Sequence, residues 1–121
     1  MRVKDAVGRF GEDVAVEHLQ AAGLQIVERN WRCRAGEVDI VARERSDLVF
    51  VEVKTRSSTA FGVPAEAVGQ RKIARLRRLA LCWLAEHREV DQFWDAVRFD
   101  VVSVLRSQVL GLQVQHLRGV F

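Results

Sequence analysis

One stretch constrains the fold of this chain more than any other: the eight residues LVFVEVKT, Leu48 to Thr55. In a β-strand, successive side chains point to opposite faces of the sheet. Both faces of this strand begin apolar, and only one of them turns polar, at Glu52 and Lys54. A strand that is apolar on both faces is typical of the centre of a sheet covered by helices on both sides. The sequence therefore predicts an α/β fold with this strand in the middle.

The periodicity of the apolar residues predicts the other elements. Spacings of three and four residues indicate a helix from about Asp5 to Ala22, closed by Gly23, and a longer helix from Pro64 to about His87. Strands are predicted in Leu24–Arg29, in both arms of the hairpin Gly36–Arg56, in Val97–Leu105 and in Leu112–Leu117, with a loop over Asn30–Ala35. The strands before and after the long helix should form a right-handed parallel βαβ unit. We expect one domain over residues 1–121, with a mixed sheet flanked by helices in the order α-β-β-β-α-β-β.

Length and composition bound the class of protein. The chain has 121 residues, of which 49% are hydrophobic, enough for one domain with its own core. Its first ten residues hold no apolar targeting segment, and no apolar run approaches the ~18 residues that span a bilayer. We therefore expect a cytoplasmic protein without membrane contact. Cys33 and Cys82 have no C-x-x-C partner, which predicts two reduced thiols.

The hairpin carries two acids where an ordinary buried strand has none. With a four-residue loop over Glu44–Asp47, Arg43 pairs with Leu48 and Asp39 falls directly opposite Glu52. Opposed side chains lie ~5 Å apart, and two like charges there repel by roughly 3 kcal/mol at an effective dielectric constant of ~20. A divalent cation between the carboxylates reverses the sign of that interaction, and Mg²⁺ is usually held by one or two carboxylates. The pattern predicts a Mg²⁺ site, with Mn²⁺ as a substitute.

Lys54 and Glu12 extend this hypothesis. Lys54 shares a strand face with Glu52, where an ammonium can position or activate a water or stabilise charge on a phosphate. Glu12 lies about 100° from the centre of the first helix's apolar face and is a further candidate. Such groups are suited to hydrolysing a phosphodiester. The alternative is structural: a cross-strand ion pair between Asp39 and Lys54, with Glu37 opposite Lys54 and Glu12 a solvated border residue.

The net charge of +3 is unevenly distributed. Residues 54–78 contain seven basic residues and one acidic residue, which suggests a polyanionic partner. On the long helix, Arg71, Arg75 and Arg78 cluster opposite the apolar face, with Lys72 at its border; the alternative is an ordinary solvated helix face. The predicted nucleic-acid-binding residues are Arg56, Arg71, Lys72, Arg75 and Arg78.

Three other features are left open by the sequence. Asp100, an acid in an apolar strand, is either a partner of the site or a strand-end residue. Trp31 lies in the predicted basic loop and either packs in the core or stacks on a base. His18 and His87 fall on apolar helix faces and are expected to be core histidines.

Several blocks of the sequence resemble a known family. They are GRFGEDVAVEHLQAAG, RNWRCRAGEVDIVARERSDLVFVEVKTR, FGVPAEAV with Lys72, VRFDVVSV and HLRGVF, which together cover essentially the whole chain. They resemble the bacterial YraN-type family of uncharacterised proteins. That family looks like a branch of the restriction-endonuclease-like PD-(D/E)xK nucleases and is similar in fold to archaeal Holliday junction resolvases. One departure is Val38, which stands where the motif name has proline.

The resemblance implies a role for each motif residue. It places Asp39 and Glu52 at the two acids of the motif and Lys54 at its lysine, while Glu12 matches a helix glutamate of the resolvase branch. The backbone carbonyl of Val53 would join the two acids as a metal ligand. The implied function is a Mg²⁺-dependent endonuclease acting on DNA, with junction DNA among its substrates and a homodimer suited to two symmetric cuts. The alternative is a nucleic-acid-binding or interaction module that keeps the fold without turnover.

Overall fold

The structure is a computed structural model that describes residues 3–57, 70–88 and 93–120. Its elements are α1 (Val3–Ala21), β1 (Gln25–Cys33), β2 (Gly36–Glu44), β3 (Asp47–Arg56), α2 (Gln70–Glu86), β4 (Ala96–Ser107) and β5 (Gly111–Leu117). The five strands form one sheet in the order β1-β2-β3-β4-β5, with β3 and β4 parallel and the other neighbours antiparallel. The predicted α/β class, mixed sheet and element order are confirmed. The predicted start of the second helix at Pro64 lies outside the described residues.

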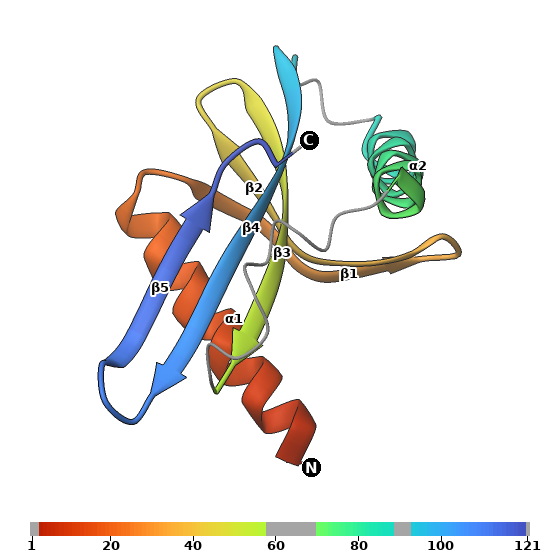
Figure 1. Cartoon of the computed structure of the whole chain (residues 1–121). Coiled ribbons are helices and arrows are strands. Elements are labelled where there is room, and N and C mark those ends of the chain that lie inside the picture. The colour runs from red at the N-terminus through yellow and green to blue at the C-terminus, as the bar shows by residue number, and fades with distance from the viewer. Residues whose placement is uncertain (1–2, 58–69, 89–92, 121) are drawn as a thin grey trace.

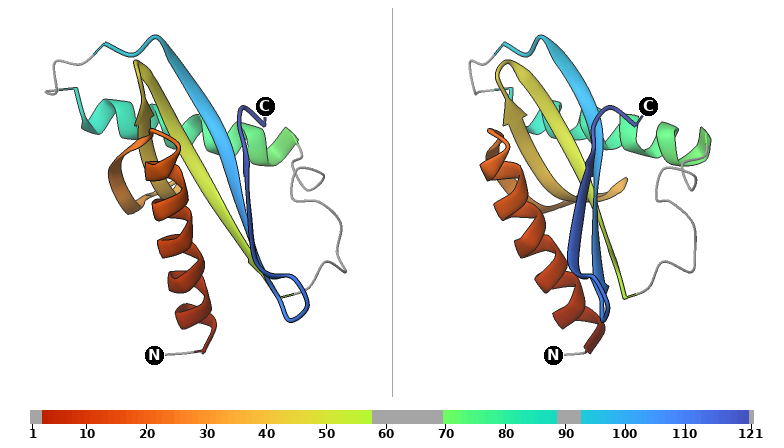
Figure 2. Two further views of the ribbon diagram at one scale, coloured as in Figure 1. Left: turned by 90° about the vertical axis from the view of Figure 1, so that its left-hand side faces the viewer. Right: turned by 60° about the vertical axis from the view of Figure 1, so that its left-hand side comes forward.

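The two helices cover opposite faces of the sheet (Figures 1 and 2). On β3, Leu48 and Phe50 pack in one buried cluster with side chains of α2, including Leu79. Val49 and Val51 pack in a second cluster with side chains of α1. The strand that the sequence places in the middle of the sheet is therefore central, and its alternating side chains supply both cores.

The β2–β3 hairpin has the register that the sequence predicts. Arg43 pairs with Leu48, and the ladder continues to Ile40 opposite Val51. The connection is shorter than expected: Glu44 and Asp47 also pair, so the predicted four-residue loop becomes a two-residue turn. This turn is tight because Arg45 adopts a positive φ of 57°.

The first strand is longer than predicted. The polar stretch at 30–35 was expected to be a loop, but β1 runs through Asn30 to Cys33 and pairs with β2. The pairing register shifts between Ile26 and Glu28, and Asn30 has a positive φ of 54°. Both irregularities interrupt the alternation of side chains between the two faces of the sheet. The sequence pattern therefore did not indicate a strand there. The resulting β1–β2 hairpin extends past the centre of the sheet toward α2 (Figure 1).

Two glycines in the N-terminal region occupy positions where the structure favours glycine. Gly23 follows α1 with a positive φ of 97°, which confirms it as the predicted C-cap. Gly11 is buried where α1 approaches β3, and a Cβ at that position would overlap Oγ1 of Thr55. The close approach at Gly11 brings the next residue, Glu12, against the sheet. Among the described residues, no helix combines the length and the apolar character needed to cross a membrane.

Candidate functional site

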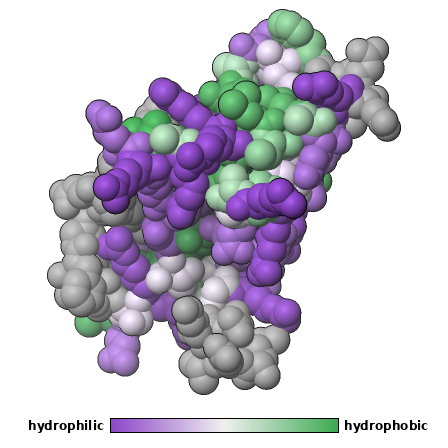
Figure 3. Space-filling model, turned by 90° about the vertical axis from the view of Figure 1, so that its right-hand side faces the viewer, coloured by the Kyte–Doolittle hydropathy of each residue, from purple (hydrophilic) through white to green (hydrophobic). Residues whose placement is uncertain are grey.

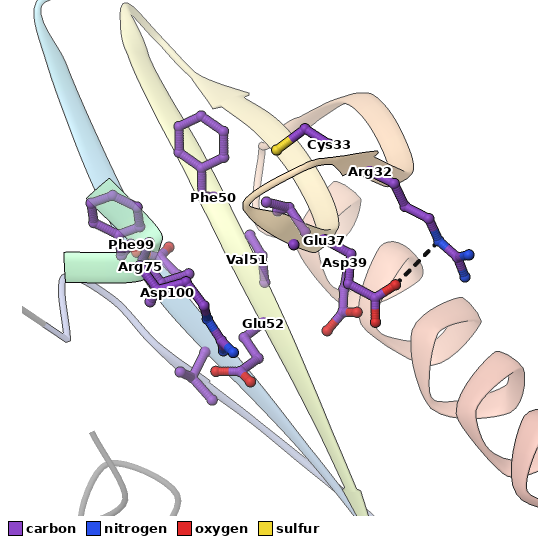
Figure 4. Close-up of a pocket in the computed structure, with 14 residues that line it drawn as sticks. Arg32, Cys33, Glu37, Asp39, Phe50, Val51, Glu52, Arg75, Phe99 and Asp100 are labelled. Carbon is purple, nitrogen blue, oxygen red and sulfur yellow. Dashed lines mark ion pairs between the residues drawn. The ribbon is translucent and has the colours of Figure 1, made fainter. Parts of the chain in front are cut away.

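A pocket of about 500 Å³ lies where the β1–β2 hairpin, β3, β4 and α2 meet. Its lining includes both acids of the predicted metal site, Asp39 from β2 and Glu52 from β3. Helix α2 contributes Arg75, one of the predicted phosphate-binding residues. In Figure 4 the guanidinium of Arg75 and the carboxylate of Glu52 point toward one another, with the carboxylate of Asp39 on the side of β2. Two acids and a cation from three elements thus share one concave site.

Asp39 lies at the position where β2 and β3 stop pairing through their backbones. The last backbone pair is Ile40 with Val51, and beyond it the Val53 N–H donates to Asp39 Oδ2 at 2.8 Å. Burial raises the pKa of Asp39 above its ordinary value. The Val53 hydrogen bond opposes this shift, whereas the negative charges of Glu12, Glu52 and Glu37 add to it. Asp39 is therefore a carboxylate whose charge is poorly compensated within the chain.

Glu52 is in the opposite electrostatic situation. Its Oε1 lies 3.2 Å from Nζ of Lys54, and its Oε2 lies 2.7 Å from Nζ of Lys72. Burial alone would raise the pKa of Glu52, but the hydrogen bond from Lys72 and the charge of Lys54 bring it below its ordinary value. Glu52 is therefore held as a carboxylate between two ammonium groups.

Lys72 has a place in the site that its sequence position did not predict. We expected it at the border of the apolar face of the long helix, among the nucleic-acid-binding residues. Its side chain is only 18% exposed and reaches Glu52. Lys72 lies four and seven residues before Leu76 and Leu79, both of which are buried on the inner face of α2. That spacing was the signal for an inward-facing lysine.

Glu12 is buried at 8% exposure and lies beside the pocket rather than in its lining. Its Oε1 accepts hydrogen bonds from Arg29 Nε at 3.1 Å and from Asn30 Nδ2 at 2.8 Å. Asn30 lies between the paired residues of β1 that bracket Asp39 on β2. Because Asn30 contacts Glu12 and lies next to Asp39, the negative charge of Glu12 is close enough to raise the pKa of Asp39. No sequence signal identified Asn30, because its role depends on the irregular backbone of β1.

The structural alternative for the acids, a cross-strand ion pair between Asp39 and Lys54, is found only in part. An ion pair is present, but Lys54 pairs with Glu52 on its own strand rather than with Asp39 across the hairpin. Glu37, expected opposite Lys54, pairs instead with Arg32 at 3.2 Å. Glu12, which was expected to be solvated under that alternative, is buried.

The predicted arginine stripe lies on the outside of α2. Arg71, Arg75 and Arg78 are exposed, and hydrophilic side chains cover much of this side of the molecule (Figure 3). Arg75 is the member that also lines the pocket. Arg56 is half-buried at the end of β3. The basic surface and the acid pair are therefore on the same side of the sheet.

Two open questions from the sequence are answered by burial. Trp31 is 6% exposed, and its Nε1 donates to Glu86 at 3.0 Å, so it packs in the core and is not a base-stacking platform. Asp100 is buried and accepts from Arg98 Nε, His116 Nε2 and the Gly119 N–H at 2.7–2.9 Å. Burial would raise the pKa of Asp100, but these partners bring it below its ordinary value. Asp100 lines the pocket and also holds the C-terminal segment to β4.

The packing of α2 on β1 also brings the two cysteines together. Cys33 and Cys82 are free thiols that pack against the same buried cluster. Partial burial and the neighbouring Cys33 thiol raise the pKa of Cys82, which favours its protonated form. The Cys82 thiol is thus expected to be a weak nucleophile.

The carboxylates of Asp39 and Glu52 are candidate ligands for a hard divalent cation. Within the described ranges, no group of three or more His, Cys, Asp or Glu side chains is arranged to hold a metal ion. Mg²⁺ is commonly bound by only one or two carboxylates, with waters and substrate phosphate completing its coordination. Asp39 and Glu52 meet that requirement in number and in chemistry. For Val53, the described contact with the site is through its N–H rather than the carbonyl that the resemblance implied.

The comparisons with known proteins identify one family. The sequence model of the uncharacterised protein family UPF0102 matches residues 11–104. A UPF0102 protein of Frankia alni is 60% identical over 121 residues, which are 100% of this chain and 98% of the relative. A UPF0102 protein of Beutenbergia cavernae is 61% identical over 120 residues, or 99% of each chain. One of Nocardia farcinica is 52% identical over 118 residues, covering 98% of this chain and 91% of the relative.

Proposed function

The chain belongs to the uncharacterised protein family UPF0102, and we propose that it is a metal-dependent nuclease that hydrolyses phosphodiester bonds in DNA. One observation carries the proposal: Asp39 and Glu52 line the same pocket together with Arg75. Carboxylates bind a hard cation, and a guanidinium binds phosphate. The resemblance to PD-(D/E)xK nucleases assigns the same two acids to the metal and therefore supports the proposal independently.

In this proposal, Asp39 and Glu52 would hold Mg²⁺ or Mn²⁺, with Glu12 beside them as a supporting charge. The bound ion would act as a Lewis acid on the phosphate and would lower the pKa of an attacking water. Lys54, 3.2 Å from Glu52, would position that water or stabilise the charge that develops on the phosphate. The Val53 N–H would keep the Asp39 carboxylate in a fixed orientation.

The arginines would position the substrate. Arg75 at the pocket would take the phosphate next to the reacting one, and Arg71 and Arg78 would follow the backbone along α2. Arg56 at the end of β3 would hold a further phosphate. Phosphate contacts of this kind position DNA without reading its sequence. Junction DNA as the preferred substrate and a homodimer for paired cuts rest on the resolvase resemblance.

A second candidate is a nucleic-acid-binding module without turnover. Its supporting observation is that Glu52 already has two ammonium partners, so its charge is satisfied within the chain. Such a protein would bind DNA through the arginines and would use the acid–lysine cluster as a structural element.

Cleavage of labelled DNA separates these candidates. Four-way junction, single-stranded and duplex substrates would be incubated with Mg²⁺, with Mn²⁺ and with EDTA. A nuclease gives products only with metal, and Asp39→Asn loses them while its circular dichroism spectrum and DNA binding remain. DNA binding without metal-dependent products on any substrate would favour the second candidate. Equal cleavage by wild type and Asp39→Asn would reject this site.

A further inference from the structure

We propose that Lys72 is an internal counter-ion that competes with the divalent cation for Glu52. Lys72 then leaves Glu52 for the substrate phosphate when the cation binds. This inference rests on the proposed function, because it concerns the same cation site. It assigns Lys72 a positioning role that differs from the surface phosphate contact expected from its sequence.

Both carboxylate oxygens of Glu52 have an ammonium partner. Lys54 contacts Oε1 at 3.2 Å and Lys72 contacts Oε2 at 2.7 Å. Glu52 is half-buried, so solvent screens these charges only in part. A divalent cation bound by Glu52 would meet two ammonium groups at contact distance. At least one of them has to move away.

Lys72 is the ammonium group that moves away from Glu52. The backbone of Lys54 pairs with Ser103 on β4, and its side chain shares a strand face with Glu52. Lys72 reaches Glu52 from α2, a separate element that covers the sheet. Its four-carbon stem allows the ammonium to change position without a shift of the helix.

The pocket offers a new position to the Lys72 ammonium. Arg75 lies three residues further along α2, on the neighbouring turn, and lines the pocket. Released from Glu52, the Lys72 ammonium can join the Arg75 guanidinium against one phosphate. Binding of the cation and of the polyanion would then favour each other, because each satisfies one half of the Lys72–Glu52 ion pair.

Asp39 and Glu52 differ in the partners that a cation would have to displace. The described hydrogen-bond partner of Asp39 is the Val53 N–H at 2.8 Å, whereas Glu52 contacts two ammonium groups. The cation therefore gains by binding Asp39 and has to displace a partner at Glu52. Lys72 thus sets the affinity of the protein for the cation in the absence of DNA.

Isothermal titration of the full chain with Mn²⁺, without DNA, tests this inference. Lys72→Met keeps the length of the side chain and its helix propensity but removes the charge. We expect it to bind Mn²⁺ roughly tenfold more tightly than wild type, a gain of ~1.4 kcal/mol. Arg77→Met is the matched control, since it removes one charge from an exposed position on the same helix, outside the pocket lining. It should change the affinity by less than about threefold, as expected for a screened charge. Lys72→Arg should keep the wild-type affinity.

Each outcome has one meaning. Affinity in Lys72→Met that is equal to or weaker than wild type, or an equal gain in Arg77→Met, would overturn the role of Lys72. The same titration of Asp39→Asn distinguishes that failure from failure of the proposed cation site. Unchanged Mn²⁺ affinity in Asp39→Asn would reject the site itself, and absence of binding in both wild type and Lys72→Met would reject both.

Discussion

The backbone N–H of Val53 donates to Asp39 Oδ2 over 2.8 Å at the point where β2 and β3 stop pairing. Glu52, the neighbouring acid on β3, is instead held by Lys54 and Lys72. Asp39 and Glu52 therefore differ in how their charge is compensated. This difference allows the effects of changing each one to be predicted separately.

Neutralising the two acids should change the stability of the metal-free protein in opposite directions. Asp39→Asn keeps an acceptor for Val53 and removes a charge that burial and nearby acids disfavour, so its stability in EDTA should equal or exceed that of wild type. Glu52→Gln leaves two ammonium groups without a carboxylate and should cost ~1–3 kcal/mol. Urea unfolding measures both. The exposed Glu17→Gln on α1 is the control and should be neutral.

Thermal melts with Mn²⁺ complete that experiment. A ligand that binds only the folded state stabilises it by ~2.7 kcal/mol at a hundredfold excess over Kd. Wild type should melt higher with Mn²⁺, and both substitutions should lose the increase. An Asp39→Asn protein that unfolds well below wild type in EDTA would mean that this carboxylate is a structural partner.

The pH dependence of stability should carry the signature of Asp39. Its folded pKa is raised, so the folded protein binds more protons than the unfolded chain between the ordinary and the raised pKa. Stability then falls as pH rises through that window. The advantage of Asp39→Asn over wild type should be largest near neutral pH and should vanish below the ordinary pKa of about 3.9. Denaturant unfolding across this range is the measurement, and an advantage that grows toward acid pH would contradict the assignment.

Glycines 8 and 11 should respond differently to alanine. A Cβ at Gly11 overlaps Thr55, so Gly11→Ala should force α1 away from β3 and cost ~1–3 kcal/mol. Gly8 has no atom within 4 Å of the added Cβ, so Gly8→Ala should stabilise the helix by up to ~1 kcal/mol. Equilibrium unfolding of the two variants compares them directly. Equal effects would show that the close contact of α1 with β3 is absent.

The arginine stripe should contribute a salt-dependent, sequence-independent part of DNA binding. Each phosphate contact adds ~0.9 to the slope of log affinity against log salt concentration. Replacing Arg71, Arg75 and Arg78 with Ala should flatten this slope and leave the fold unchanged. The exposed residues Arg9, Arg45 and Arg88 provide a control triple with the same change in net charge. Equal slopes in the two triples would assign the stripe to an ordinary solvated surface.

Much of this architecture could be predicted because it depends on regular elements. Alternation along residues 48–55 placed β3 in the centre, and the hairpin register followed from the loop assumed over Glu44–Asp47. That register brought Asp39 and Glu52 to one pocket. These features depend on the two-residue period of a strand, which a single sequence carries well.

The features that the sequence did not predict depend on irregular backbone and on contacts between distant elements. β1 was cut short because its register shift and the positive φ of Asn30 remove the alternation. The contact of Lys72 with Glu52 depends on how α2 packs against β3, and the sequence showed only that Lys72 lies near the apolar face. The partners of Asp100 come from β4, from β5 and from the segment after β5, which no spacing rule connects.

The most direct test of the central claim is the position of a bound cation. Crystals of the full chain soaked in Mn²⁺ would be measured at the manganese absorption edge. We predict an anomalous difference peak within ligand distance of carboxylate oxygens of both Asp39 and Glu52, with the Lys72 ammonium moved away from Glu52. A fully soaked crystal without a peak between these two acids, or with Mn²⁺ bound only elsewhere, would contradict the claim.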